Sequence, residues 1–567
     1  MHRMTWEATK ELKRRLSLER GAITKDWGGK LPIAIVYPNS YFVGMSNLGM
    51  QTVYKHINAD DRFVCERIFW EDAENMPSTG FSRAVGVRRE QRPAVPGISI
   101  ESQRPMQDFP VLAFSISYEQ DYFNVVKLLK TAGIPLWSRE RNENHPLIIA
   151  GGPCMITNPE PIAPFFDAIA VGEGEPILPQ LMDTIENGIN GSRQELLHAL
   201  SKIPGIYVPS INKGVVERQY LINIDEHATR SEILTPETEF NDMYTMEVAR
   251  GCGRGCRFCI AGYLFRPMRP RNLDFLLDQA RHGLTMTNKI GLLGAAVADH
   301  PELDALVTEL KGMGASISIS SLRVDNLSDA VLTALDKSGA RNVTVAPEAG
   351  SERMRKVVNK GLSEEQILDG FHKVGKHGIK QMKLYFIVGL PTETDEDAMA
   401  IADITSKGRA ILDSYKSNTH IVVDMSPFSP KPGTAFQWHS VMPVEVVERR
   451  LQGIRKALSG KNIEVKWDSP QWSEIDTCLS RGGHELAEAI AEAGMGGVGA
   501  FRGAMKKVGL DIHSYVYKSY PMDKPLPWDI IGTGVKKDFF ILEAINSGRQ
   551  KEFPVCAPSG CKACGVC

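Results

Sequence analysis

Two series of short, strongly apolar runs constrain the fold of this 567-residue chain more than any other feature. The runs of the first series are separated by segments with helical periodicity, and they lie at residues 33–36, 111–114, 147–150 and 168–171. Strands that are apolar at every position are buried on both faces, which is typical of parallel sheets covered by helices on both sides. We therefore predict an α/β fold that begins with a doubly wound, Rossmann-like sheet over residues 31–205.

The second series makes six strand candidates, at residues 243–249, 290–293, 317–320, 343–346, 384–388 and 421–425. In open parallel sheets and in barrels, ligand sites lie at the carboxyl ends of the strands, so the loops after these runs are where functional residues are expected. The other parts are a helical extension (1–30), a polar linker (206–240), a mainly helical region (446–545) and a cysteine-containing tail (546–567).

Three cysteines stand in eight residues directly after the first run of the second series: Cys252, Cys256 and Cys259. Thiolates are the usual ligands of iron–sulfur clusters, and this C-x3-C-x-aromatic-C loop, with Phe258 as its aromatic residue, can hold three irons of a [4Fe-4S] cluster. The fourth iron would have no protein ligand. Zinc is the alternative, but structural zinc normally takes four ligands, and no fourth Cys or His lies nearby in the sequence.

This loop resembles the signature of the radical S-adenosylmethionine (SAM) enzymes position for position. The resemblance implies that SAM binds the open iron, and that an electron from a donor such as flavodoxin or ferredoxin cleaves it to a 5'-deoxyadenosyl radical. It also implies that residues 241–445 form the partial (β/α)6, TIM-like barrel of this family. The protein would bind, orient and exclude water while the cofactors carry the difficult chemistry.

The resemblance places the SAM contacts in the cysteine loop and in the loops after the barrel strands, at Phe258, Gly294, Ser321, Arg323, Glu348, Gly389 and Pro427. Gly294 stands where the family often has Gly-Gly-Glu, and because the acidic residue is missing, backbone carbonyls would have to hold the SAM amine. Glu348 could accept from the SAM amine or ribose, and Arg323 could pair with the SAM carboxylate in a bidentate manner. The alternative for both side chains is a structural ion pair inside the barrel.

The loops of the first series resemble the cobalamin-binding domain that precedes the radical SAM domain in one large subfamily. The residues that carry this resemblance are Asn39, Ser40, Gly44, Ser115, Ser117, Tyr118, Gly151, Gly152, Gly172, Glu173 and Gly174. The Asp-x-His-x-x-Gly motif that supplies a lower axial histidine in other cobalamin domains is absent. Cobalt would then be bound without a protein histidine, or the domain has lost cobalamin and these loops are ordinary strand-to-helix turns.

The chain ends with a second cysteine group, Cys556, Cys561, Cys564 and Cys567. Four cysteines in twelve residues can close a metal site completely, and C-x2-C-x2-C is nearer to ferredoxin spacing than to common zinc spacing. The tail therefore predicts a second iron–sulfur cluster that relays electrons, or a structural zinc site. With this tail, the chain resembles over nearly its whole length one group of cobalamin-domain radical SAM proteins, from which it departs at Pro432-Gly-Thr434 and Arg481-Gly-Gly-His484.

Composition narrows the remaining functions. A formal net charge of −2 gives no broad basic surface for nucleic acid. No long apolar stretch or signal-peptide pattern is present, so we expect no membrane insertion and a cytoplasmic location. His484 could donate a proton near a substrate, but a lone histidine beside a turn is more often solvated.

The leading hypothesis is a cobalamin-dependent radical SAM methyltransferase that acts on an unactivated carbon. A second hypothesis keeps the radical chemistry but ends in rearrangement, cyclisation, oxidation or methylthiolation. Methylthiotransferases also carry a second cluster, although in an N-terminal domain. A non-enzymatic sensor of cobalamin or redox state is the third, and the intact three-cysteine loop argues against it. The substrate does not follow from the sequence.

Overall fold

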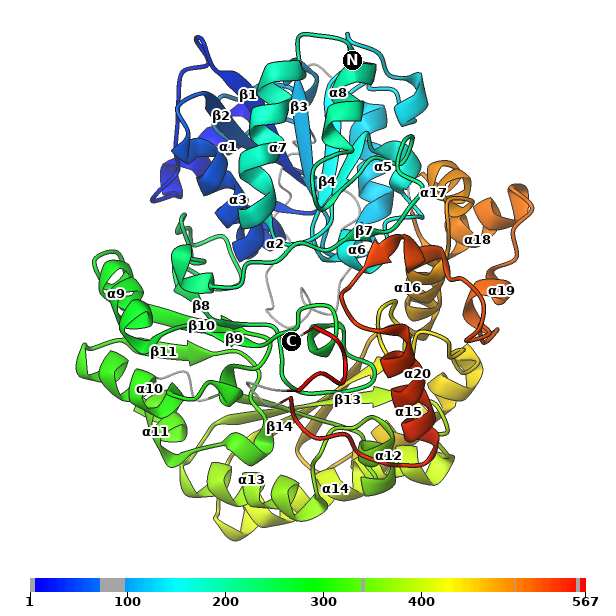
Figure 1. The fold of residues 1–567 in the computed structure, drawn as a ribbon. Helices are drawn as coiled ribbons and strands as arrows, with labels where there is room; N and C mark the ends of the chain where they lie inside the picture. The colour runs from blue at the N-terminus through cyan, green and yellow to red at the C-terminus, as the bar shows by residue number, and fades with distance from the viewer. Residues whose placement is uncertain (1–5, 72–96, 338–341, 495, 557–560, 567) are drawn as a thin grey trace.

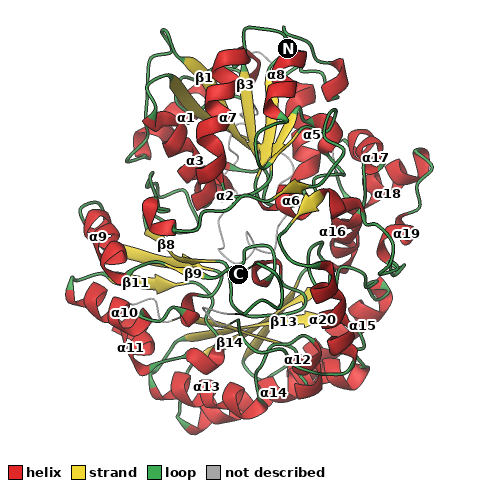
Figure 2. Cartoon of the chain, viewed as in Figure 1, coloured by secondary structure: helices red, strands yellow, loops and turns green. Residues whose placement is uncertain are grey.

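The computed structural model describes residues 6–71, 97–337, 342–494, 496–556 and 561–566, and every structural statement concerns these residues. Figure 1 shows an N-terminal α/β body above a larger α/β body, with C-terminal helices along the right-hand side of both. In both bodies the strands lie inside and the helices outside (Figure 2). The mixed α/β class expected from the two series of apolar runs is confirmed.

The N-terminal body holds a six-stranded sheet with the order β2-β1-β3-β4-β5-β6, which is parallel except for β6. Its strands are β1 (Leu31–Tyr37), β2 (Phe63–Phe69), β3 (Val111–Ser115), β4 (Leu147–Gly151), β5 (Ala168–Ala170) and β6 (Ile206–Tyr207). Its helices are α1 (Trp6–Leu18), α2 (Tyr41–Met45), α3 (Leu48–Ala59), α5 (Asp121–Thr131), α6 (Pro153–Thr157), α7 (Gly174–Gly188) and α8 (Arg193–Leu200).

Both faces of this sheet are buried, as its apolar runs predict. Ile35 packs in a core that includes Ile177 of α7, whereas the next residue, Val36, points into an opposite core with Phe123 of α5. Helices α16 (Pro470–Arg481), α17 (Leu486–Ala493), α18 (Val498–Lys507) and α19 (Ile512–Val516) complete the second core. Phe123 meets Phe501 of α18 edge to face, with ring centroids 5.5 Å apart. The C-terminal helices are thus part of the N-terminal body's core.

The second body is built from two four-stranded sheets, β11-β10-β8-β9 and β12-β13-β14-β15. A single parallel bridge, Leu322 to Val345, joins the loop after β11 to β12. The strands are β8 (Tyr244–Arg250), β9 (Arg269–Pro270), β10 (Lys289–Gly294), β11 (Ser316–Ile319), β12 (Asn342–Glu348), β13 (Gln381–Val388), β14 (His420–Pro427) and β15 (Ile463–Trp467). The helices are α9 (Leu273–Leu284), α10 (Leu303–Gly312), α11 (Asp329–Lys337), α12 (Glu352–Val357), α13 (Glu364–Lys376), α14 (Asp395–Ser414) and α15 (Val444–Leu458).

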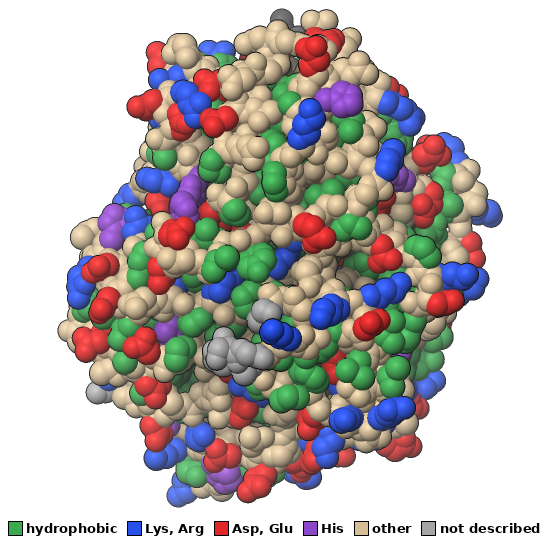
Figure 3. Space-filling view, in the orientation of Figure 1, with side chains coloured by type: hydrophobic (Ala, Val, Ile, Leu, Met, Phe, Trp, Pro, Cys, Tyr) green, Lys and Arg blue, Asp and Glu red, His purple; other side chains and the backbone are tan. Residues whose placement is uncertain are grey.

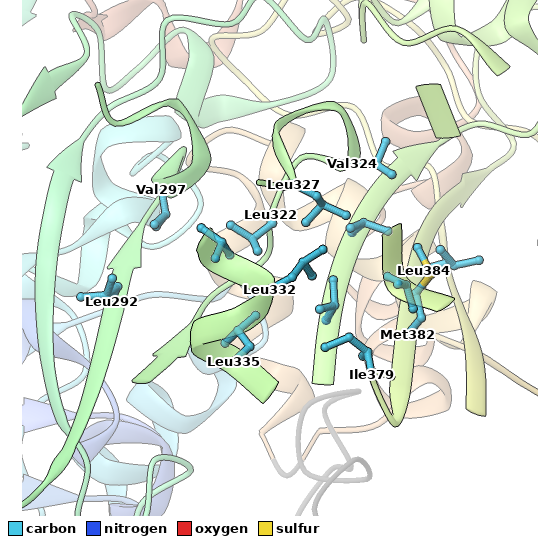
Figure 4. Packing of buried hydrophobic residues seen from close by; sticks show 14 of the residues in the cluster. Leu292, Val297, Leu322, Val324, Leu327, Leu332, Leu335, Ile379, Met382 and Leu384 are labelled. Atoms are coloured by element: carbon cyan, nitrogen blue, oxygen red, sulfur yellow. The ribbon is translucent and has the colours of Figure 1, made fainter. Parts of the chain in front are cut away.

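Alternation along the strands separates a helix-facing core from an inner polar face. Met382 and Leu384 of β13 are buried against the helices, and Figure 4 shows them in one continuous cluster with Leu332 and Leu335 of α11. Lys383 and Tyr385 lie between them in sequence and therefore point to the opposite, inner face of the sheet.

Two predicted boundaries differ in the structure. The second body does not end at residue 445, because β15 pairs in parallel with β14 and α15 packs into the same core. The run that forms β15 alternates apolar and charged residues, so it lacks the continuous apolarity that identified the other strands. The predicted linker 206–240 contains β6 and also β7 (Val216–Glu217), which pairs with β16 (Ile531–Gly532). The last helix is α20 (Lys537–Gly548).

Charges of both signs are scattered over the face of the molecule drawn in Figure 3. This agrees with the near-zero net charge of the sequence. Among the described helices, none combines the length and the apolar character that crossing a bilayer requires.

Candidate functional site

The three-cysteine loop begins where β8 ends, at the carboxyl edge of the strands of the second body. Cys252 and Cys256 are buried, and Cys259 is half-buried. Burial and the neighbouring sulfurs of Cys256 and Cys252 raise the pKa of Cys259 to about 12, so the three thiols influence one another electrostatically. Burial likewise raises the pKa of Cys252, whose sulfur accepts a hydrogen bond of 3.4 Å from the Arg254 backbone N–H.

Neighbouring buried thiolates repel one another, and a bound metal centre offsets that repulsion, so the donor set fits an iron–sulfur cluster. In the part of the chain that the structure describes, no three Cys, His, Asp or Glu side chains are arranged to hold a metal ion. The assignment therefore rests on the type and spacing of the ligands. Of the three glycines around these cysteines, only Gly251 has a positive φ, +78°, and a Cβ there would lie 2.0 Å from the Phe265 carbonyl oxygen.

Several parts of the chain fix the position of the loop. The Arg257 N–H donates to the Val358 carbonyl (3.0 Å), the Arg257 carbonyl accepts from Phe436 (3.2 Å), and Asn359 Nδ2 donates to the Gly255 carbonyl (3.0 Å). The Arg257 guanidinium is fully buried and pairs with Glu543 of α20. These bonds satisfy the backbone of an irregular buried segment and hold it in one geometry.

Two charged side chains lie next to the cysteines. Lys360 Nζ is 3.0 Å from Glu348 Oε1, and Lys360 interacts electrostatically with Cys256, as Glu348 does with Cys259. Glu348 has a φ of +68° and follows an irregularity in the pairing of β12 with β13. Strained non-glycine residues of this kind cluster at binding sites. Glu348 was predicted from the sequence, whereas Lys360, twelve residues later in a loop, had no signal there.

The other predicted SAM residues differ in their surroundings. Phe258 packs with Ile387, Leu390 and Phe428 at the ends of β13 and β14. Arg323 forms a bidentate ion pair with Asp325 and also donates to the Lys360 carbonyl, which is the structural alternative considered for it.

The remaining four of these residues lie in tight positions or in the open. Ser321 is exposed, and Gly294 stands at the pairing irregularity that ends β10. Gly389 and Pro427 line a cavity of about 20 Å³, which is large enough for a water molecule but too small for a purine base.

The predicted cobalamin residues after β1 and β3 meet at one sheet edge. Asn39 Nδ2 donates to Asp121 Oδ1 (2.7 Å), and Asn47 donates to the Ser117 hydroxyl (3.2 Å). Ser40 caps the N-terminus of α2, and Ser115 ends β3. The Tyr118 residue is 47% exposed at this edge.

The glycines of these loops are of two kinds. Added Cβ atoms at Gly44, Gly152 and Gly172 would lie 2.4 Å from the Phe69 ring, 2.5 Å from the Ile116 oxygen and 2.2 Å from the Gln219 oxygen. The chain's own packing therefore requires these three glycines. Gly151 keeps open space, since its nearest neighbour, the Ala170 Cβ, would be 3.8 Å away. There is therefore space for a large ligand beside Tyr118 and Gly151, whereas the backbone packed against Gly172 leaves none there.

In the loop after β5, Glu173, which was predicted as a cobalamin contact, forms ion pairs within the chain. Glu173, just before Gly174 at the start of α7, accepts from Arg269 at 2.7 and 3.0 Å, from Arg250 at 2.8 Å and from the Leu221 N–H at 2.9 Å. Burial opposes ionisation, but the Arg269 hydrogen bond and the Arg250 charge outweigh it and lower the pKa of Glu173. The Glu173 carboxylate therefore joins the N-terminal body to the second body.

The C-terminal tail lies directly on the cysteine loop. The Cys556 N–H donates to the Gly253 carbonyl at 2.8 Å, and Cys564 is buried in an aromatic cluster with Tyr263, four residues after Cys259. Cys561 is half-buried, and Cys567 lies outside the described residues. His484, in contrast, pairs with Glu160 at 2.9 Å near the surface, and this hydrogen bond raises the pKa of His484.

Comparison with protein families matches two parts of the chain. Residues 49–209 match the family described as radical SAM proteins, N-terminal, and residues 246–404 match the radical SAM superfamily.

Individual relatives are similar over different lengths. The uncharacterized protein MJ0966 of Methanocaldococcus jannaschii is 30% identical over 472 residues, which cover 81% of this chain and 90% of that protein. The uncharacterized methyltransferase PH0819 of Pyrococcus horikoshii is 25% identical over 51% of this chain and 61% of its own length. A tRNA-2-methylthio-N(6)-dimethylallyladenosine synthase of Aquifex aeolicus is 28% identical over 36% of this chain and 48% of its own length.

A solved structure is also similar. The radical SAM methyltransferase TsrM of Kitasatospora setae, with cobalamin and a [4Fe-4S] cluster bound, has a TM-score of 0.47 and 12% identity over 84% of this chain and 98% of that chain.

Proposed function

The chain belongs to the radical SAM superfamily, and from that premise we propose that Cys252, Cys256 and Cys259 hold the [4Fe-4S] cluster with which it cleaves SAM. When bound, the cluster and SAM supply a 5'-deoxyadenosyl radical that abstracts hydrogen from a substrate. The observation that carries the proposal is the cysteine loop at the barrel edge, bonded on several sides and flanked by the Glu348–Lys360 pair.

The roles of the chain's own residues follow from their positions. The three thiols bind three irons, and the anchored Arg257 fixes the loop that carries them. Glu348 offers an acceptor and Lys360 a donor beside the cysteines, which suits the amine and carboxylate of a bound amino acid. Phe258 packs against an apolar cluster and would help to exclude water from the loop.

The test is SAM cleavage by anaerobically reconstituted protein with a chemical reductant. We expect 5'-deoxyadenosine from the native chain and none from Cys256→Ala. Production of 5'-deoxyadenosine at the native rate by the Cys256→Ala protein would contradict the proposal.

We further propose that the radical serves methyl transfer to an unactivated carbon and that cobalamin binds at the edge formed by Ser115, Ser117, Tyr118 and Gly151. The open space at Gly151, the exposed Tyr118 and the resemblance of these loops to cobalamin domains support this choice. A relative named as an uncharacterized methyltransferase adds to it. With cobalamin present, SAM should also yield S-adenosylhomocysteine, and its absence would remove methyl transfer.

Methylthiolation is the second candidate. The contact between Cys556 and Gly253 favours it, because a metal centre held by the tail would lie beside the first cluster. A relative named as a methylthiolating synthase adds to it. About eight irons per chain would support a second cluster, whereas about four irons and one zinc would support a structural site.

A further inference from the structure

Ten side chains from the N-terminal body, the second body and the segments that join them interact electrostatically with one another, and we call this group the polar ring. It consists of Tyr118, Glu119, Asp121 and Cys154 from the N-terminal body, Glu239 from the connecting segment, Lys383, Asp424, Lys431 and Asp468 from the barrel, and Asp476 from α16. None of these residues was predicted as part of a site except Tyr118.

Two ion pairs, Lys383 with Asp424 and Lys431 with Glu119, are the direct contacts between members, and the other members are connected through electrostatic interactions. On the barrel side, Glu239 interacts with Lys383, which pairs with Asp424 at 2.7 Å, and Asp424 interacts with Asp468. Asp468 in turn interacts with Asp476 of α16.

The remaining interactions of the polar ring reach the N-terminal body. Lys431 interacts with Asp476 and pairs with Glu119 at 2.6 Å. Cys154 interacts with Glu119 and Tyr118, and Tyr118 interacts with Glu239. Four separate parts of the chain therefore face one region.

Several members of the polar ring keep partial contact with solvent. The side chains of Lys383 and Asp424 are each 18% exposed, Lys431 is 27% exposed and Glu119 is 14% exposed. Desolvation nevertheless dominates the shifts that raise the pKa of Glu239 and of Asp476 to about 7. Side chains that are partly exposed and yet strongly desolvated are recessed from the open surface.

The charges of the polar ring do not balance. It contains six carboxyl groups but only two lysines, and each lysine already pairs with one carboxylate, Lys383 with Asp424 and Lys431 with Glu119. Among the described residues the other four carboxyls form no ion pair: Ser426 donates to Asp468, Gln120 to Asp476 and Asn39 to Asp121. No hydrogen bond or ion pair to the Glu239 carboxylate is present among the described residues.

An unpartnered buried atom points independently to a missing ligand. Asp121 is 1% exposed, and its Oδ2 has no hydrogen-bond partner. Oδ1 of Asp476 is also buried without a partner. Buried polar atoms without partners are rare in native proteins, because each one costs the full desolvation of the group. A donor that carries positive charge would satisfy such an atom and offset the excess of carboxyl groups.

We propose that the polar ring binds the substrate through a protonated amine or guanidinium group. This inference rests on the proposed function, since it names the class of molecule presented to the radical: a small organic cation, held between the N-terminal edge and the inner face of the barrel. Molecules that carry phosphate or carboxylate groups are disfavoured, because they would meet four carboxyl groups that form no ion pair among the described residues.

The experiment is a calorimetric titration of the anaerobically reconstituted full-length protein with agmatine, which carries one amine and one guanidinium. We expect binding in which glutarate, a dianion of similar length, does not compete. Asp476→Asn and Glu239→Gln should each weaken agmatine binding by about tenfold, the usual effect of losing one charge-assisted hydrogen bond. The exposed Glu309→Gln on α10 is the matched control and should bind like the native chain.

Proton release on ligand binding gives a second measurement of the site. Because Glu239 and Asp476 titrate near pH 7, a bound cation should expel protons from them, so the measured enthalpy should depend on the ionisation enthalpy of the buffer. That dependence should shrink in both variants. Circular dichroism spectra and melting curves exclude a folding defect, and Asp468→Asn is a replacement if either variant fails to fold.

Two outcomes would overturn the inference: binding of glutarate as tight as that of agmatine, and folded Asp476→Asn and Glu239→Gln variants that bind agmatine like the native chain. SAM cleavage is measured on the same samples, so loss of cleavage with intact agmatine binding would contradict the proposed function and leave this inference standing.

Discussion

The ion pairs of Glu173 give the sharpest test of how the two bodies are joined. Glu173→Gln keeps the size of the side chain but removes its charge, and with it the charge-assisted bonds to Arg269 and Arg250. The Arg269 side chain is 7% exposed, and Glu173 is its only carboxylate partner among the described residues. Arg250 keeps Glu175 and Glu247 as partners.

The magnitude follows from these surroundings. Breaking a buried ion pair by removing one partner typically costs about 3–5 kcal/mol, because it leaves an uncompensated charge. The variant keeps an amide that can still accept one hydrogen bond, so we expect a loss near the lower limit, about 3 kcal/mol. The folded-state pKa of Glu173 is lowered, so its stabilisation is complete above the ordinary glutamate pKa of about 4.3 and is lost as the pH falls below it.

The assay is urea unfolding at pH 7 and pH 4 on protein without added cofactors, combined with limited proteolysis. Glu173→Gln should lower the unfolding midpoint at pH 7, narrow its difference from the native chain at pH 4 and expose the segment between the bodies to protease. The control is Glu186→Gln, whose partner Arg62 is 46% exposed and has two further carboxylate partners, so its effect should stay within about 0.5 kcal/mol. Equal midpoints for native and Glu173→Gln proteins at pH 7 would refute the reasoning, and a loss confined to cobalamin retention would restore the role predicted from the sequence.

Three further predictions concern the site. Lys360→Gln should raise the SAM concentration needed for half-maximal 5'-deoxyadenosine formation by about tenfold, because it removes the cation beside Glu348 and the cysteines, and an unchanged value would exclude Lys360 from SAM binding. Asp121→Asn should raise the free energy of unfolding at pH 8 but not at pH 4. Burial raises the pKa of Asp121 to about 8, above its unfolded value of about 3.9, so the native carboxyl costs increasing stability as the pH rises between these two values. A difference in urea midpoint between variant and native chain that is the same at both pH values would contradict this. Cys561→Ala with Cys564→Ala should lower the metal content by the share of the second site and leave the iron of the first, and an unchanged metal content would mean that the tail holds no metal.

Sequence patterns predicted the strands well because burial leaves a local trace. Runs such as residues 33–36 and 147–150 are apolar at every position, and the structure uses them as central strands. The strand β15 escaped prediction because it alternates, and α16 to α19 were placed in a separate region although they cover the N-terminal sheet. Which body a helix covers depends on distant partners such as Phe123 and Phe501, and periodicity carries no information about that choice.

The candidate site divides in the same way. The cysteine spacing and Glu348 were visible in the sequence, because a short motif and a strand end are local features. Lys360 and the polar ring were not, since each of these side chains has an ordinary sequence context and acquires its meaning from neighbours tens to hundreds of residues away. Two members of the polar ring, Lys383 and Asp424, could be noticed in the sequence, because they are charged residues within otherwise apolar strands.

The contrast between two polar clusters separates architecture from binding. The cluster around Glu173 balances its charges, with Glu173, Glu175 and Glu247 against Arg250, Arg269 and Arg271. Such a network satisfies itself and holds the bodies together. The polar ring has an excess of four carboxyls, and burial makes their ionisation costly, so it lowers the stability of the folded protein. A cluster that costs stability and joins side chains of both bodies has the properties of a site completed by a ligand. Lys431 and Asp468 follow the ends of β14 and β15, at the edge of the second body where the cysteine loop follows β8, so a cation held beside them would lie on the side from which the radical acts.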